Sequence, residues 1–216
     1  MISFCTTVKN RAENLQRLVC SLVSMHATLP WELVVADFAS DDANLAEMAP
    51  GKLVQVNSQW FNRSKGLNTA AAAAKYAKLF FIDVDMLVPQ TFVSIIDTQV
   101  QPGQCYFPIC YSLHKDKPPI ISHDSKDPNK ANGWWRKEGC GMAGFCKSDF
   151  DALGGWDEGI GKSYGKEDGE LYRRSITLTR IRTKQPGLFH VWHPTSQSFR
   201  EGYHQVQRKL KPRKPK

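Results

Sequence analysis

The amino-acid sequence predicts an α/β protein with a mostly parallel central sheet and helices on both of its faces. In the first hundred residues, short apolar runs alternate with segments of helical periodicity. This order is typical of parallel strands joined by crossover helices. Several of the runs also end in polar or acidic residues. Ligands of such sheets bind beyond the carboxyl ends of the strands, so the residues after each run are candidates for a functional site.

The apolar runs and the leucine spacing fix where the first elements should lie. Apolar runs of strand length predict strands, and apolar residues at helical spacing predict amphipathic helices. A polar turn at residues 40–42 is expected to cap a short helix through Leu45 and Met48. Strands are expected at residues 2–8, 32–37 and 52–57, and the first helix is expected at residues 12–26.

An alanine-rich segment and a strongly apolar run follow. Residues 62–78 predict a helix because alanine has the highest helix propensity. Residues 79–83 (LFFID) predict a fourth strand that stops at two aspartates. The second half is less regular. Residues 114–135 lack periodicity, which is typical of either a functional loop or a disordered segment, and residues 187–192 form a final apolar run.

Length and composition favour one domain. The 216 residues are enough for one sizeable core and short for two. No apolar stretch reaches the ~18 residues that cross a bilayer, and the N-terminus lacks the order of a secretory signal. We therefore expect a cytoplasmic location. The six cysteines lack zinc-site spacing and are expected to be free thiols, with Cys5 and Cys20 in apolar settings.

The net charge of +8 is unevenly distributed. Residues 208–216 (RKLKPRKPK) are basic, contain prolines and cannot build a core. They form either a solvated chain end or a segment that attracts an anionic partner. Nucleic acid, a phospholipid membrane surface and lipopolysaccharide are the partners considered, and the membrane alternative would place the protein at the membrane periphery.

Asp83-Val84-Asp85 is the first candidate site. Two carboxylates at the end of a strand suit a hard divalent cation that also binds phosphate oxygens. A pair of solvated surface aspartates is the simpler interpretation of so short a motif. The four apolar residues that precede it argue against an exposed surface and favour the metal site.

Two further groups of residues carry possible chemistry. Glu167 and Asp168 are adjacent acids, so one could act as a general base while the other binds a substrate hydroxyl. The alternative is that they favour a helix N-terminus through its dipole. His190 and His193 could complete a metal site with the aspartates, since imidazole is a frequent ligand of manganese and related metals. A packed core role is the alternative for either histidine.

Four segments together resemble the β-1,4-galactosyltransferase family, within the larger group of GT-A fold glycosyltransferases that includes chondroitin polymerase and polypeptide N-acetylgalactosaminyltransferase. The opening residues 6–15 and residues 35–42 resemble GT-A enzymes more broadly. The resemblance covers most of residues 2–194 in the expected order. The four segments are residues 61–68 (FNRSKGLN), 81–86 (FIDVDM), 141–145 (GMAGF) and 164–168 (YGKED).

The resemblance implies a role for each candidate residue. It implies a GT-A domain over residues 1–207, with a nucleotide-binding half at 1–100 and an acceptor and catalytic half at 101–207. Asp168 would be the catalytic base, and Glu167 would bind the sugars. Asp85 would be the principal metal ligand, with Asp83 on the sugar or the ion and His190 or His193 completing the shell. The donor site would be lined by Thr7, Arg11, Asp37, Phe61, Arg63, Asp83 and Val84.

The implied activity is transfer of a sugar from a nucleotide-sugar, with UDP as the expected nucleotide, to a glycan hydroxyl with inversion. Mn²⁺ is the expected ion and Mg²⁺ the alternative. Tyr164 replaces the tryptophan usual in relatives, and Gly169 interrupts their acidic run, so donor and acceptor identity stay open. Two other functions are alternatives. One is a transferase of the same fold that glycosylates nucleic acid. The other is a non-catalytic module that binds nucleotide-sugars or glycans.

Trp134, Trp135 and Trp156 are the remaining aromatic candidates. Trp134 and Trp135 end the irregular segment, where exposed rings could stack on sugars or anchor the loop in the core. Trp156 is expected to pack in the core.

Overall fold

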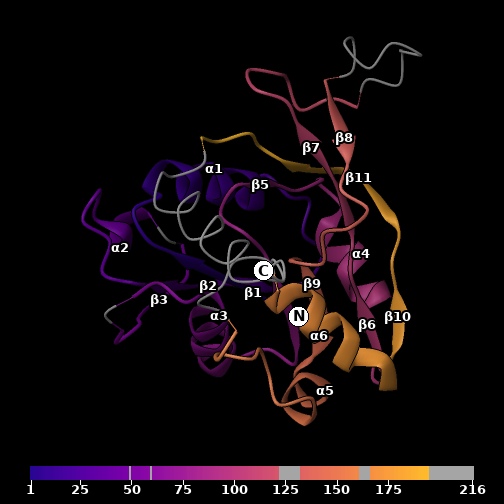
Figure 1. Ribbon diagram of the computed structural model, residues 1–216. Helices are drawn as coiled ribbons and strands as arrows, with labels where there is room; N and C mark the ends of the chain where they lie inside the picture. The colour runs from indigo at the N-terminus through magenta and orange to yellow at the C-terminus, as the bar shows by residue number, and fades with distance from the viewer. Residues whose placement is uncertain (49, 59, 122–131, 161–165, 195–216) are drawn as a thin grey trace, which may run out of the picture.

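A computed structural model describes residues 1–48, 50–58, 60–121, 132–160 and 166–194 of the chain. Its centre is a seven-stranded sheet with the order β10-β6-β9-β4-β1-β2-β3 (Figure 1). Strands β4, β1, β2 and β3 are parallel, as predicted, and β10 is parallel to β6. Strand β9 runs antiparallel to both β4 and β6. The strands are β1 (Ile2–Val8), β2 (Trp31–Asp37), β3 (Lys52–Gln55), β4 (Lys78–Phe81), β6 (Gln104–Tyr106), β9 (Ala143–Cys146) and β10 (Thr179–Ile181).

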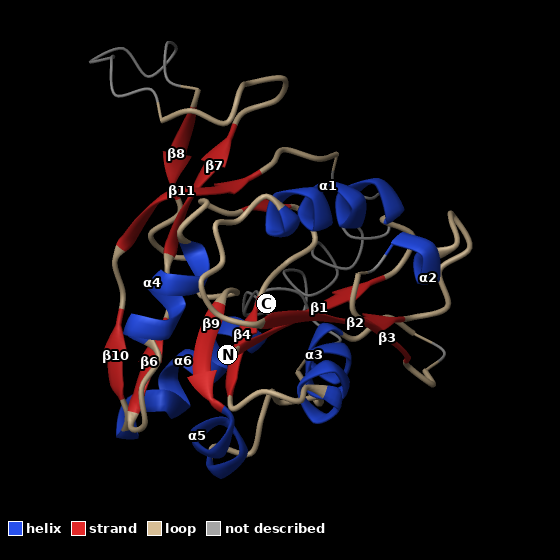
Figure 2. Ribbon diagram, turned by 180° about the vertical axis from the view of Figure 1, so that it is seen from behind, coloured by secondary structure: helices blue, strands red, loops and turns tan. Residues whose placement is uncertain are grey.

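Helices cover both faces of this sheet, as the sequence predicts. Figure 2 shows α1 on one side of strands β1–β3 and α3 on the other. The alternation of side chains along a strand explains the two layers. Phe4 and Phe80 face the layer that contains α1 and α4, whereas Cys5 and Phe81 face the layer that contains α3, α5 and α6. The helices are α1 (Ala12–Val23), α2 (Leu45–Met48), α3 (Arg63–Ala73), α4 (Phe92–Gln99), α5 (Lys147–Ala152) and α6 (Glu167–Arg174), followed by a 3₁₀ turn (Ser175–Thr177).

A second sheet of four strands, which the sequence did not predict, lies beside the first. Its order is β5-β11-β7-β8. Strand β11 pairs antiparallel with β5 and parallel with β7, and β8 is antiparallel to β7. This sheet brings the late histidines to the aspartate motif, because β5 directly follows Asp85. Its strands are β5 (Met86–Leu87), β7 (Ile109–Leu113), β8 (Gly133–Trp135) and β11 (Lys184–His190).

The alanine-rich helix is shorter than predicted. Helix α3 ends at Ala73, and Ala74 already has an extended backbone. Side chains from elsewhere fix the chain after it. The ammonium of Lys147 donates to the carbonyls of Ala71 and Ala74, and the backbone N–H of Lys75 donates to Glu32. These tertiary contacts override the high helix propensity of the segment.

The predicted cap of helix α2 is wrong. The Oδ2 atom of Asp42 accepts a hydrogen bond from the backbone N–H of Ala12, at the start of α1, over 2.8 Å. Asn44 lies beside the start of α2 instead, and its side chain accepts from Ala46. Spacing along the chain predicted a local partner, whereas the parallel packing of β1 on β2 places the 40–42 turn beside the start of α1.

Two other expectations need correction. Trp134 and Trp135 belong to strand β8 rather than to a loop end; Trp134 is half exposed, and Trp135 packs against Tyr111. All six cysteines are free thiols, as expected, but Cys20 is exposed on α1 rather than buried. Trp156 is buried, as predicted. The basic tail at residues 208–216 and its proposed anionic partners lie outside the described residues.

Within the part of the chain that the structure describes, no helix has both the length and the apolar character needed to span a bilayer.

Candidate functional site

The carboxyl ends of three neighbouring strands hold most of the predicted site residues. Thr7 and Asp37 lie at the carboxyl ends of β1 and β2, whose register pairs Val8 with Asp37. Asp83 and Asp85 follow β4, which pairs with β1 on its other side. Because these strands are parallel, their carboxyl ends share one edge of the sheet, where ligands of this fold class bind. The structure therefore brings these predicted site residues together at the edge where the sequence predicts a site.

Pairing between β5 and β11 brings the late histidines to Asp85. The register matches His190 with Met86, and the backbone N–H of Val191 donates to the carbonyl of Asp85 over 2.9 Å. His190 therefore lies beside the aspartate, and His193 follows as the chain leaves the sheet. Residues about 105 positions apart meet because one more hydrogen bond of the ladder joins the residue before β5 to the residue after β11.

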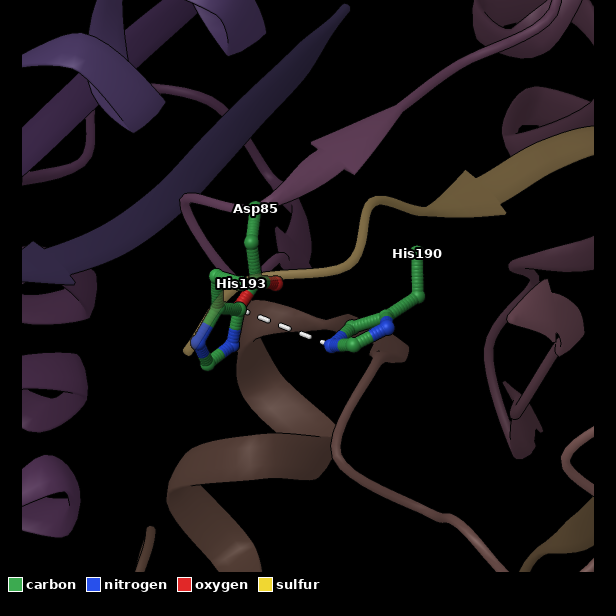
Figure 3. Close-up of side chains that lie close together, drawn as sticks. All are labelled: Asp85, His190 and His193. Atoms are coloured by element: carbon green, nitrogen blue, oxygen red, sulfur yellow. Dashed lines mark ion pairs between the residues drawn. The ribbon is translucent and has the colours of Figure 1, made fainter. Parts of the chain in front are cut away.

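Asp85, His190 and His193 form a compact cluster in which all three side chains point toward one another (Figure 3). The Nε2 atom of His193 lies 2.9 Å from Oδ2 of Asp85, and Nε2 of His190 lies 3.7 Å from the same oxygen. The candidate ligand atoms of the three residues all lie within 4.8 Å of one another. Where the sequence left His190 and His193 as alternatives, the structure brings both to Asp85.

Partners outside the cluster contact the Nδ1 atoms of both histidines, while their Nε2 atoms face Asp85. Nδ1 of His190 lies 2.9 Å from Oγ of Ser112, which turns Nε2 toward Asp85. Nδ1 of His193 lies 3.2 Å from the carbonyl of Pro194. Outer partners of this kind orient ligating imidazoles in metal sites. The Oδ1 atom of Asp85 is buried and has no hydrogen-bond partner among the described residues.

The protonation states of the three side chains also fit a metal-binding role. Burial lowers the pKa of His190 to about 4, so this imidazole is neutral near pH 7 and offers a lone pair. The hydrogen bond between His193 and Asp85 raises the pKa of His193. Burial acts to raise the pKa of Asp85, but the hydrogen bond from His193 and the charges of the histidines outweigh it and lower the pKa. One carboxylate and two imidazoles suit a transition metal such as Mn²⁺.

Arg63 organises a second cluster next to the first. Its guanidinium donates to Oδ1 of Asp83 from Nε over 3.0 Å and from Nη2 over 2.8 Å. It also donates to Oδ1 of Asp168 over 2.8 Å and to the carbonyl of Gly141 over 2.7 Å. Glu167 lies 3.9 Å from the same group. The predicted base and the first aspartate of the motif are thus joined by one side chain.

Helix α6 supplies the two acids of this cluster. It begins at Glu167, so Glu167 and Asp168 both lie in its first turn, where negative charge is favourable. Glu167 is almost fully buried, and burial together with the charge of Asp168 raises its pKa. Asp168 is more exposed, with 24% of its side chain accessible. Of the two adjacent acids, Asp168 is the one that an incoming molecule can reach.

The start of helix α3 explains three residues of the 61–68 segment. The Asn62 side chain accepts from the backbone N–H of Lys65 and so caps the helix, while its Nδ2 donates to the carbonyl of Glu158. Arg63 is the first helical residue and points into the acid cluster. At Gly66, a side-chain Cβ would lie 2.1 Å from Oγ1 of Thr7. Glycine therefore allows α3 to approach β1 closely at the site edge.

The remaining donor-site candidates are Asp37, Phe61, Arg11 and Val84. Asp37 is buried and accepts from Ser40 and Gln55. Phe61 is 45% exposed, and its ring centroid lies 5.0 Å from that of Phe38. Arg11 stands at the start of α1, and the side chain of Val84 packs against the core. Their roles in binding a donor stay predictions, as does a role for Asp83 on the ion, because Asp83 lies outside the Asp85–His190–His193 set.

Sequence reasoning missed two residues of the site. Ser112 orients His190 from strand β7, and the carbonyl of Gly141 receives Arg63. Neither residue has a chemical type or a spacing that points to its role, and only the pairing of β7 with β11 places Ser112 opposite His190. Tyr164, where the sequence departs from the resembled family, lies outside the described residues.

Solved structures share this fold at low sequence identity. TarS of S. aureus in complex with UDP-GlcNAc is 14% identical, has a TM-score of 0.67, and the match covers 93% of this chain and 64% of that one. The mannosyltransferase PcManGT of Pyrobaculum calidifontis, in complex with GDP-Man and Mn²⁺, is 14% identical with a TM-score of 0.61 over 99% of this chain and 65% of that one. Both are GT-A glycosyltransferases, so the predicted GT-A fold is confirmed.

Curated relatives match at higher identity. Human chondroitin sulfate N-acetylgalactosaminyltransferase 2 is 36% identical over 155 residues, which are 65% of this chain and 28% of the relative. Human chondroitin sulfate synthase 3 is 32% identical over 61% of this chain and 16% of the relative. The chain thus spans under a third of the length of these proteins. The profile of the chondroitin N-acetylgalactosaminyltransferase family matches residues 7–211. The chain belongs to the chondroitin N-acetylgalactosaminyltransferase family.

Proposed function

We propose that this chain is a metal-dependent glycosyltransferase that moves N-acetylgalactosamine from its UDP-sugar to a hydroxyl of a chondroitin-type glycan, with inversion at the anomeric carbon. The relatives named above support this sugar and this class of acceptor. The family and the GT-A fold support a nucleotide-sugar donor. The cytoplasmic location expected from the sequence stays a prediction.

The observation that carries the proposal is the pair of adjacent clusters at one sheet edge. Asp85, His190 and His193 offer a set of metal ligands. Asp168 offers an accessible carboxylate, and Arg63 links it to Asp83, two residues from Asp85. A binding module would need neither a metal set nor a base, whereas glycosyl transfer uses both.

The ion would be held by Asp85, His190 and His193. When bound, a divalent ion supplies positive charge that stabilises the diphosphate as it leaves. We infer Mn²⁺ because two of the three ligands are imidazoles, which suit transition metals better than they suit Mg²⁺. Neutral His190 is ready to act as a ligand, and the proton shared between His193 and Asp85 would leave when the ion binds.

The protein residues perform the proton transfer. Asp168 accepts the proton of the acceptor hydroxyl as the oxygen forms its bond to the anomeric carbon. The bond between that carbon and the diphosphate oxygen breaks on the opposite face, and its electron pair leaves with the diphosphate. One displacement of this kind inverts the anomeric configuration. Binding of the sugars by Glu167 stays a prediction, because this side chain is buried beside Arg63.

The proposal is tested by a panel of nucleotide-sugars with a chondroitin oligosaccharide as acceptor. UDP-N-acetylgalactosamine should give acceptor-dependent release of UDP, and UDP-glucose and GDP-mannose should give much less. An NMR measurement of the anomeric proton in the product should show the configuration opposite to that of the donor. Retention of configuration would contradict the displacement, and acceptor-independent turnover with every donor would contradict a specific transferase.

A further inference from the structure

Arg63 occupies an unusual position for a residue that the family resemblance places beside the nucleotide. Only 13% of its side chain is exposed, and its guanidinium forms ion pairs with Asp83 and Asp168. Its guanidinium contacts the end of strand β4 at Asp83, the segment before β9 at Gly141 and the start of helix α6 at Asp168. It also lies 5.1 Å from the ring centroid of Trp156. One side chain therefore connects four separate segments.

Electrostatics explains why a cation is needed at this point. Asp83, Glu167 and Asp168 are three acids that surround one guanidinium. Like charges in a partly buried place repel one another and shift toward their neutral forms unless a cation stands between them. Burial disfavours the charged form of Arg63, but the neighbouring carboxylates outweigh it and raise its pKa further. Arg63 thus stays charged and keeps the acids close together.

The geometry also requires arginine rather than lysine. The Nε and Nη2 atoms both bond to one oxygen of Asp83, Nη1 bonds to Asp168, and Nη2 also bonds to Gly141. A planar fork with several fixed donors can make these contacts in different directions at once. A lysine ammonium is a single point of charge and cannot reach both carboxylates with the same directionality.

The hydrogen bonds of Arg63 join the segment that holds the proposed metal ligand Asp85 to the proposed base. Asp83 lies two residues before Asp85, the centre of the metal-ligand set, and Asp168 is the proposed base. We propose that Arg63 is a positioning residue that fixes the carboxylate of Asp168 relative to the metal-bearing segment, rather than a residue that binds the donor. This inference rests on the proposed function and assigns a new role within the same site.

The test compares Arg63→Met and Arg63→Lys with the same substitutions at Arg174. Arg174 is a matched control because it also makes a bidentate ion pair, with Glu170, and donates to the carbonyl of Gly155. It lies at the far end of the same helix α6. If Arg63 merely anchored α6, substitutions at Arg63 and at Arg174 would change the transfer rate and Tm in the same way. Transfer from UDP-N-acetylgalactosamine, binding of UDP with Mn²⁺ by calorimetry, and Tm are measured for each variant.

For Arg63→Met we expect kcat to fall on the order of 10²-fold, the loss that follows a misplacement of about 1 Å. KM for the donor and the affinity for UDP should change little. Arg63→Lys should recover part of kcat because it restores the charge without the fork. The Arg174 variants should lower Tm while kcat stays near that of the wild type. A raised donor KM or weaker UDP binding with unchanged kcat would overturn the proposal in favour of a donor-binding role.

A crystal structure of Arg63→Met separates this inference from the proposed function. We expect helix α6 to stay in place while the carboxylate of Asp168 moves away from Asp83. An unchanged distance between the two carboxylates would overturn the positioning role, whatever the activity. Absence of transfer in the wild type would instead overturn the proposed function, and the crystal structure would still decide the role of Arg63.

Discussion

The Nε2 atom of His193 lies 2.9 Å from Oδ2 of Asp85, although the two residues are more than a hundred positions apart in the chain. His190 approaches the same oxygen, and Oδ1 of Asp85 is buried without a partner among the described residues. A hydrogen bond between the histidine and the aspartate occupies the place where an ion would be held. The expectations below follow from this cluster and from its neighbour around Arg63.

Replacement of either histidine should weaken metal binding. His190→Ala and His193→Ala each remove one nitrogen ligand, so the affinity for Mn²⁺ measured by calorimetry should fall for both variants. His26→Ala is the control, because His26 is exposed and is not part of the cluster. If only one of the two substitutions lowered the affinity, the ion would be held by a smaller set of ligands than the geometry indicates.

Asp168→Asn should abolish most transfer while leaving nucleotide binding in place. The amide keeps the size of the side chain and can accept a hydrogen bond from Arg63, but it cannot take a proton from a hydroxyl. Loss of a positioned base costs about 10²–10⁴-fold in rate. Transfer rate and UDP affinity are measured side by side. Turnover close to that of the wild type would remove Asp168 from the mechanism.

Gly141→Ala should lower the transfer rate without unfolding the protein. A methyl group at this position would lie 2.9 Å from Oδ2 of Asp168 and 3.3 Å from Nη2 of Arg63, so the carboxylate must shift. Gly169→Ala is the control in the first turn of α6, directly after Asp168, because a methyl group there meets no atom within 4 Å. We expect kcat to fall for Gly141→Ala alone. Equal rates for both variants would show that the position of the Asp168 carboxylate is not critical.

Asp42→Ala should destabilise the fold by about 1 kcal/mol, the usual cost of losing a side chain that caps a helix N-terminus. Asp42 accepts from the backbone N–H of Ala12, the first residue of α1. Asp41→Ala serves as the comparison because Asp41 lies next to Asp42 in the same turn and is also exposed. Urea unfolding of the two variants gives the difference. Equal midpoints would mean that water replaces Asp42 at the helix start without cost.

Local patterns predicted the parallel half of the fold well. The apolar runs at β1, β2, β3 and β4 are strands as expected, and the aspartates after β4 lie at the predicted edge. The runs at β1, β2 and β4 are recognisable because their residues are mostly buried, whereas the residues of β3 are exposed or partly exposed. The end of α3 was predicted wrongly because Lys147 and Glu32, both distant in sequence, fix the chain after Ala73.

The site could be predicted in composition but not in arrangement. Asp85, Asp168 and the two histidines stood out by residue type and by resemblance to a family. The second sheet did not, because β5 and β8 have only two and three residues and because strands such as β5 and β11 pair across a long separation in sequence. Ser112 has its role through the pairing of β7 with β11, and Gly141 has its role through the approach of Arg63. Residue type alone gives no sign of such contacts.

The most direct test of the account is the rate of N-acetylgalactosamine transfer in the presence of a chelator, followed by addition of Mn²⁺. Asp85, His190 and His193 are proposed to hold the ion on which departure of the diphosphate depends. The account predicts that the chelator abolishes transfer and that excess Mn²⁺ restores it. An undiminished rate in the chelator would contradict the metal-dependent mechanism.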